Sequence, residues 1–103
     1  MPVIYFRRGF AVIDDEYKVE LQAMLSLARK YHFAPVVIEG WCDATGSDNI
    51  NDQLSQQRAN VVADWLMQNG IAGERINARG MGVDVAKGTS NAARRTELRF
   101  VVK

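Results

Sequence analysis

Residues 36–66 read VVIEGWCDATGSDNINDQLSQQRANVVADWL, and this stretch decides the fold. It opens with a β-branched, apolar run over residues 36–42, which predicts a buried strand. Residues 43–49 are polar and rich in turn formers, so they predict a loop. From about residue 51 to residue 68, apolar residues return at helical spacing and predict a helix that runs back along the strand. The stretch is therefore a strand, a loop and a helix of an α/β domain.

One charged residue lies in the apolar stripe of that predicted helix. The stripe advances in steps of four, three and one, through Leu54, Arg58, Val61, Val62, Trp65 and Leu66. A guanidinium keeps its charge at any ordinary pH, and leaving it unpaired in a dry interior is costly. Arg58 therefore needs an anion, either from the protein or from a ligand.

The sequence on either side of this unit predicts the remaining elements of a two-layer domain. Short strands are expected over residues 3–6 and 75–79, and a helix from Asp14 or Asp15 to about Tyr31. Residues 80–91 are expected to form a polar loop, and Asn69-Gly70 to end the second helix. A final strand is indicated by alternation: Thr96, Leu98, Phe100 and Val102 face one way, and Arg95, Glu97 and Arg99 the other.

The predicted order is thus β-α-β-α-β-β. The fold class that follows is a two-layer α/β sandwich, with a mixed sheet and both helices on one face. At 103 residues the chain has the length of one domain, spanning 1–103. A strand-like run begins almost at the first residue, so we expect a part of a longer protein. No apolar run reaches the length of a membrane span, and a membrane connection is expected only through other parts of that protein.

Composition argues against several classes of function. The chain has one cysteine, Cys42, and one histidine, His32, so no metal ligand set and no cofactor are expected. No activated nucleophile or paired acid and base is visible, and a hydrolase would need Cys42 to be nucleophilic. Seven of the 13 Lys and Arg residues follow residue 74, but no aromatic platform interleaves them. We therefore expect neither catalysis nor nucleic acid binding, and interpret the basic segment as a solvated strand and loop.

Asp43 follows directly on the predicted buried strand. In strand-then-helix units, ligands tend to lie at the carboxyl ends of strands, beside the following helix. Because the helix returns along the strand, the side chains of Asp43 and Arg58 can meet near the loop. Two interpretations stay open from the residues alone. The two side chains form a partly buried ion pair that fixes the loop, or they are split across a zwitterionic ligand, with Arg58 on its carboxylate and Asp43 on its ammonium.

The motifs around these two residues resemble the core of OmpA-like peptidoglycan-binding domains, the type found in OmpA, Pal and MotB. The family pattern is roughly G-H-T-D-x-x-G-S and then N-x-x-L-S-x-x-R-A. Here it corresponds to GWCDATGS over residues 40–47 and NDQLSQQRA over residues 51–59. Further matches lie downstream, at Gly70-Ile71, Arg75-Ile76, Gly80-Met81-Gly82 and Arg94-Arg95. The resemblance covers nearly the whole chain, in order.

The resemblance implies a non-catalytic domain that binds peptidoglycan through the meso-diaminopimelate of its stem peptide. Such a domain anchors a parent envelope protein to the cell wall in the bacterial periplasm. The family motif puts Asp43 on the ligand's ammonium and Arg58 on its carboxylate. Further candidates for ligand contacts are Asn51, which is equally plausible as a helix cap, and Thr45, Trp41 and Phe6.

The chain also departs from the family pattern. Trp41 replaces the usual histidine, and its indole could cover part of the groove or offer a stacking surface for sugar. Cys42 replaces a threonine, as a small apolar residue of a buried strand. Arg7 stands where many members carry an acidic residue, and Ala93 where asparagine is usual. These departures leave an alternative open: a degenerate OmpA-like domain that serves protein interaction or oligomerisation, for example as a homodimer, without binding peptidoglycan.

Overall fold

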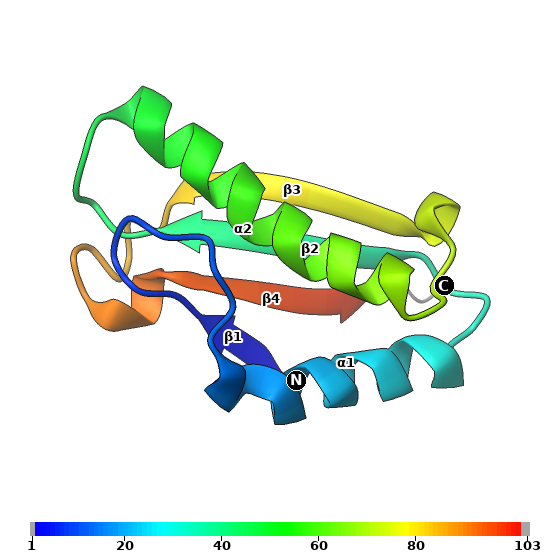
Figure 1. Cartoon of the computed structure of the whole chain (residues 1–103). Coiled ribbons are helices and arrows are strands. Elements are labelled where there is room, and N and C mark those ends of the chain that lie inside the picture. Colours follow the sequence, from blue (N-terminus) through cyan, green and yellow to red (C-terminus); the bar gives the residue numbers. More distant parts are fainter. Residues whose placement is uncertain (1, 102–103) are drawn as a thin grey trace.

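The structure is a computed structural model that describes residues 2–101 (Figure 1). Its elements follow the predicted order β-α-β-α-β-β, with short 3₁₀ turns between some of them. The strands are β1 (Val3–Tyr5), β2 (Val36–Cys42), β3 (Ile76–Val83) and β4 (Arg95–Phe100). The helices are α1 (Lys18–Lys30) and α2 (Asp48–Gln68), and the 3₁₀ turns are Asp15–Tyr17, Gly73–Arg75 and Asn91–Ala93. Val102, predicted to continue the inward row of the last strand, lies outside the described residues.

The four strands form one mixed sheet in the order β1-β4-β2-β3. β4 is antiparallel to both β1 and β2, whereas β2 and β3 are parallel. A parallel pair needs a crossover connection, which α2 provides. Figure 1 shows both helices on the same side of the sheet, with α2 crossing over β2 and β3 and α1 lying near β1. The predicted two-layer sandwich with a mixed sheet is confirmed.

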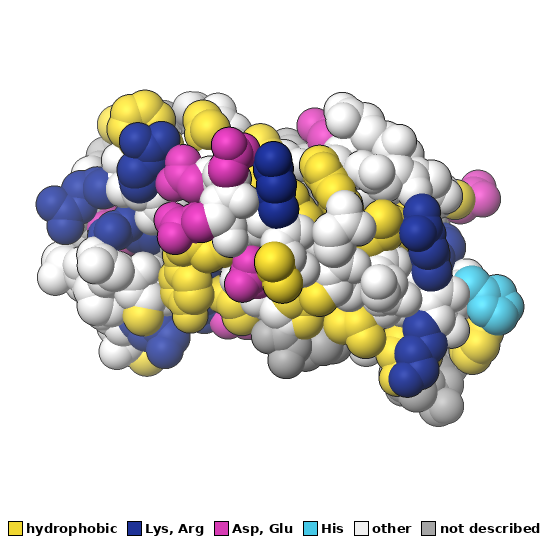
Figure 2. Space-filling view, turned by 60° about the horizontal axis from the view of Figure 1, so that its bottom comes forward, with side chains coloured by type: hydrophobic (Ala, Val, Ile, Leu, Met, Phe, Trp, Pro, Cys, Tyr) yellow, Lys and Arg dark blue, Asp and Glu magenta, His cyan; other side chains and the backbone are white. Residues whose placement is uncertain are grey.

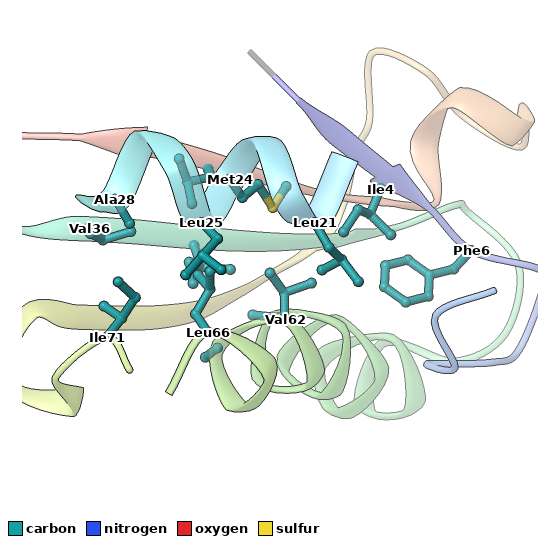
Figure 3. Packing of buried hydrophobic residues seen from close by; sticks show 14 residues of the cluster. Ile4, Phe6, Leu21, Met24, Leu25, Ala28, Val36, Val62, Leu66 and Ile71 are labelled. Carbon is teal, nitrogen blue, oxygen red and sulfur yellow. The ribbon is translucent and has the colours of Figure 1, made fainter. Parts of the chain in front are cut away.

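The hydrophobic core lies between the helices and the sheet. The stripe predicted for the first helix supplies Leu21, Met24, Leu25 and Ala28, and all four are buried. Figure 3 shows these side chains against Val62 and Leu66 of α2, with Ile4, Phe6 and Val36 from the strands around them. The largest fully buried side chain is not apolar, however, because Arg58 is only 1% exposed. The position predicted for Arg58, on the buried face of α2, is confirmed.

Two glycines let α2 approach the sheet closely. Gly40 of β2 and Gly80 of β3 are partners in register. A Cβ atom at Gly40 would lie 2.1 Å from the carbonyl oxygen of Ser55, and one at Gly80 would lie 2.5 Å from the backbone nitrogen of Gln56. The expectation of a loop from residue 80 is therefore wrong for residues 80–83, which belong to β3. Glycine in a strand marks close approach of another backbone as well as a turn.

The ends of α2 are set by local chemistry. The Ile50 N–H donates to the side-chain oxygen of Ser47 at 3.2 Å, so the helix begins at Asp48, earlier than residue 51. Asn51, the other candidate for a cap, lies inside the first turns. At the other end the N–H groups of Gly70 and Ile71 reach back to α2 carbonyls at 3.1 Å, with Gly70 at a φ of +100°. This αL ending was predicted from Asn69-Gly70 and is confirmed.

Candidate functional site

Asp43 is a nearly buried carboxylate at the carboxyl end of β2, and it accepts three hydrogen bonds and lies at ion-pair distance from a second arginine. One oxygen, Oδ1, accepts the backbone N–H of Thr45 at 3.2 Å and the hydroxyl of the same residue. The other, Oδ2, lies 3.1 Å from Nη1 of Arg94 and 3.5 Å from Nε of Arg8. Burial raises the pKa of Asp43, but the hydrogen bonds from Thr45 and Arg94 outweigh burial and leave the pKa below its usual value. Asp43 is therefore ionised at neutral pH.

Arg58 is held by carbonyl oxygens and not by Asp43. Its Nε donates to the carbonyl of Phe10 at 2.9 Å, Nη1 to that of Trp41 at 2.9 Å, and Nη2 to that of Arg7 at 3.2 Å. Within residues 2–101, no carboxylate lies within 4.0 Å of its guanidinium. Of the two interpretations left open by the sequence, the direct ion pair between Asp43 and Arg58 is therefore wrong. The physical reason is that the loop after β1 comes close enough to offer its backbone oxygens to the buried guanidinium.

The charges at this end of the molecule do not balance. Carbonyl dipoles stabilise the Arg58 cation but do not neutralise it, whereas Asp43 is already compensated by Arg94 and Arg8. Burial lowers the pKa of Arg58, yet a guanidinium stays protonated at physiological pH. Figure 2 shows Lys and Arg side chains gathered at the left, the end that carries the loops beyond β1 and β2. The site thus carries an excess of positive charge and favours an anionic group.

A surface pocket of about 400 Å³ is lined in part by Arg94. Arg94 links this pocket to Asp43, which is not part of the lining, because its Nη1 lies 3.1 Å from Oδ2 of Asp43. Basic, acidic and aromatic side chains all line the pocket. The lining comprises Tyr5, Phe6, Arg7, Asp14, Glu16, Tyr17, Asn91, Ala92 and Arg94. The pocket therefore offers charges of both signs and aromatic ring surfaces.

The other predicted site residues differ in their placement. Thr45 contacts Asp43 directly, because its hydroxyl and its backbone N–H both donate to Oδ1 of that carboxylate. Asn51 is buried, and its carbonyl accepts from the thiol of Cys42 at 3.3 Å. Phe6 lines the pocket but is buried in the core, with its ring centroid 5.4 Å from the guanidinium carbon of Arg58. Phe6 therefore makes a cation–π contact with the buried guanidinium of Arg58 and also borders the pocket.

Trp41 lies on the opposite side of the sheet from α2. Because side chains alternate along a strand and Gly40 and Cys42 face the helix, the indole points to the helix-free face. There the guanidinium carbon of Arg95 lies 5.0 Å from its ring centroid, and Arg95 is paired with Asp84 at 2.8 Å. The expectation that Trp41 covers the groove or stacks on a sugar beside Asp43 is therefore not supported by its position.

Cys42 is buried, as expected for a small apolar substitute in the strand. Its Sγ lies 3.6 Å from Nη1 of Arg58. Burial is the largest influence on this thiol and raises its pKa. A protonated, buried thiol is a poor nucleophile. The geometry of Cys42 gives no support to a hydrolase.

The sequence interpretation missed the roles of four arginines. Arg94 was noticed only as part of the double-arginine motif, and Arg8 was not singled out at all. Arg95, expected to be solvated, is 6% exposed. Arg75 likewise serves the fold, since its Nη2 donates to the carbonyls of Ala28 at 3.0 Å and Tyr31 at 2.8 Å, at the end of α1. Charge patterning in the sequence could not reveal these contacts, because each joins segments far apart in the chain.

The chain is similar to known proteins in both sequence and fold. Residues 5–98 match the OmpA family. The chain belongs to this family.

Relatives of this OmpA-family chain share both sequence and fold. It is 37% identical over 81 residues to the peptidoglycan-binding protein ArfA of Mycobacterium tuberculosis, a match that covers 79% of this chain and 24% of the relative. The chain thus spans about a quarter of that protein. The peptidoglycan-associated lipoprotein of Burkholderia pseudomallei superposes with a TM-score of 0.86 at 25% identity, over 98% of this chain and 91% of that one. The cell wall anchor of the type VI secretion system (T6SS) of Pseudomonas aeruginosa gives 0.75 at 26% identity, over 98% and 80%.

Among residues 2–101, no three His, Cys, Asp or Glu side chains are grouped so that they could bind a metal ion. No helix in the same part of the chain combines the length and apolarity needed to cross a membrane.

Proposed function

We propose that this domain binds peptidoglycan without catalysis, through the free zwitterionic end of meso-diaminopimelate in the stem peptide. Through this contact it anchors a parent protein of the bacterial envelope to the cell wall. Asp43 receives the ligand's ammonium and Arg58 attracts its carboxylate. Thr45 fixes the Asp43 carboxylate in place, and the pocket beside Arg94 receives the adjoining part of the stem peptide.

The observation that carries the proposal is the uncompensated charge of Arg58. A guanidinium that is buried and held only by carbonyl oxygens still has its full charge, and the favourable partner for such a charge is an anion. Asp43 lies close by with a carboxylate that is ionised. An amino-acid end group, with a carboxylate and an ammonium on one carbon, matches these two charges together.

The relatives support the same ligand class. ArfA is named a peptidoglycan-binding protein, the Burkholderia protein a peptidoglycan-associated lipoprotein and the Pseudomonas protein a cell wall anchor. Both motifs that surround Asp43 and Arg58 in this chain lie within the residues matched to the family. These names also favour a place in the bacterial envelope.

Sedimentation with purified, insoluble sacculi tests the proposal. We expect the wild-type domain to sediment with sacculi that contain diaminopimelate, and Asp43→Asn to lose about tenfold or more in affinity, as expected when a charged hydrogen bond is lost. Asp43→Asn is gentler than Asp43→Ala, because an amide still occupies the place between Thr45 and Arg94.

The matched control is Asp64→Asn, an equivalent change at an exposed position of α2. It should sediment like the wild type, and circular dichroism with thermal melting should show that both variants are folded. If the wild-type domain stays in the supernatant with intact sacculi, peptidoglycan binding is wrong. The alternative, a protein-interaction module of the same fold, then becomes the better interpretation.

A further inference from the structure

The open side of the Asp43 carboxylate, which a ligand ammonium would approach, is occupied by Arg8 in this structure. A carboxylate accepts about four hydrogen bonds, and three are made here, two from Thr45 and one from Arg94. Arg8 makes no hydrogen bond to Asp43, but its Nε lies 3.5 Å from Oδ2, at ion-pair distance. An ammonium that takes the remaining position must compete with the Arg8 guanidinium.

The groups around Asp43 differ greatly in how firmly they are held. Thr45 is two residues from Asp43, and its contacts are local. Arg94 is 11% exposed at its side chain, and it is also tied to the carbonyl of Phe6 at 3.0 Å and to Oδ1 of Asn91 at 2.7 Å. Arg8, in contrast, is 62% exposed, and among the described residues Asp43 is its only carboxylate partner within 4.0 Å. Arg8 is therefore the group that can leave at low cost.

We infer that Arg8 occupies the position of the ligand ammonium on Asp43 in the free domain, and that binding exchanges the guanidinium for the ammonium. The inference rests on the proposed function, and it adds a residue that sets affinity. Arg8 lowers the affinity for any ligand whose ammonium must reach Asp43. It leaves unaffected a ligand that offers the carboxylate alone. Arg8 thus makes binding to the cell wall weaker and more readily reversible than it would be in a domain that lacks Arg8.

The test compares two peptides and three proteins by isothermal titration calorimetry. One peptide is a stem tripeptide with meso-diaminopimelate; the other has 2-aminopimelate in its place, which keeps the distal carboxylate and lacks the distal ammonium. An ion pair with one exposed partner contributes modestly, so Arg8→Ala should bind the diaminopimelate peptide about two- to fivefold more tightly than the wild type. Its affinity for the 2-aminopimelate peptide should be unchanged.

Arg99→Ala is the matched control. Arg99 is half-exposed, at 50%, lies outside the pocket lining, and pairs with Glu39 and not with Asp43. Arg99→Ala should therefore leave both affinities at their wild-type values. If Arg8→Ala binds the diaminopimelate peptide with unchanged or lower affinity, the exchange is wrong even though the proposed function stands. If neither the wild type nor Arg8→Ala binds that peptide, the proposed function itself fails.

The free domain gives a second, independent readout. The Nε–H resonance of Arg8 in nitrogen-15 NMR should shift when Asp43→Asn removes the carboxylate charge, and the corresponding resonance of Arg7 should not. An Arg8 resonance that is indifferent to Asp43→Asn overturns the inference regardless of any ligand.

Discussion

Arg58 shows how a buried charge can be stabilised without a counterion. Three carbonyl oxygens, two from the segment after β1 and one from β2, accept hydrogen bonds from one planar guanidinium. Only a fork of fixed N–H donors can reach all three at once, and a lysine ammonium on its flexible stem cannot. Arg58 therefore joins the segment after β1 to the end of β2, and its charge is a by-product of this structural task that a ligand can use.

This geometry makes Arg58→Lys a structural substitution as well as a functional one. We expect it to lower the free energy of unfolding by about 3 kcal/mol, since hydrogen bonds from a charged group are lost in a buried site. Urea denaturation measures the change. Gln57→Ala, an exposed neighbour on the same helix, should stay within about 0.5 kcal/mol of the wild type. An equally stable Arg58→Lys protein would contradict the view that the three carbonyls need a guanidinium.

Asp43 gives a pH dependence at the same scale. Its pKa is lowered in the folded protein, because hydrogen bonds from Thr45 and Arg94 outweigh the opposing effect of burial. A carboxyl with a lowered folded pKa stabilises the fold above its unfolded value, about 4, and that stabilisation is lost as the pH falls through the folded value. The stability difference between wild type and Asp43→Asn should thus be constant above about pH 5 and shrink below pH 4. Denaturation curves from pH 7 to pH 2.5 measure it, and a difference that grows on acidification would refute this assignment.

At the scale of elements, α2 and the two parallel strands depend on a pair of glycines. The sequence predicted β2 and the stripe of α1 correctly, since apolar period and burial agree there. The predicted α2 stripe is buried at Arg58, Val62 and Leu66 and only half-buried at its other three positions. The prediction failed at residues 80–83, because a local sequence pattern treats glycine as a turn former. Here Gly80 leaves room for the backbone of α2 against the strand. The close approach of α2 to β3 depends on where the helix crosses the sheet, and a local sequence pattern carries no information about that position.

Gly80→Ala tests this element packing. The added Cβ would meet backbone atoms of Gln56, which cannot move without shifting α2, so we expect a loss of about 1–3 kcal/mol in the free energy of unfolding. Gly73→Ala is the matched control. Its Cβ would meet only Sδ of Met67 at 3.1 Å, the far part of a flexible side chain. Thermal melts that fail to separate the two variants would show that α2 can move aside at little cost.

At the scale of the whole molecule, the site exists because of the strand order. β4 lies between β1 and β2, so its start and the end of β1 are brought beside the end of β2. That order delivers Arg94 and the loop with Arg8 to Asp43. The sequence could single out Asp43 and Arg58 as candidates, because they belong to one continuous strand-loop-helix unit. It could not identify their long-range partners, since periodicity predicts strands without telling which of them are neighbours.

The strand order also leaves β3 at an edge of the sheet, where α2 protects it. Alternate residues of a strand direct their N–H and C=O groups to the same edge, and the side-chain amide of Gln56 pairs with two of them. Its Nε2 donates to the carbonyl of Ala78 at 3.1 Å, and its Oε1 accepts the N–H of Gly80 at 2.9 Å. Ser55 similarly accepts the N–H of Gly82 at 3.0 Å. These contacts occupy backbone groups that would otherwise be available to a second sheet.

Gln56→Ala should therefore promote pairing of two domains through β3. We expect a monomer-to-dimer shift that grows with protein concentration, together with a loss of about 1–2 kcal/mol in the free energy of unfolding. Light scattering after size-exclusion chromatography measures the mass. Gln57→Ala on the exposed side of α2 serves as the control, and Gln56→Glu should lie between, because a carboxylate can accept from Gly80 but cannot donate to Ala78. If Gln56→Ala loses stability but keeps the mass of the wild type at every concentration, Gln56 stabilises the strand without guarding its edge.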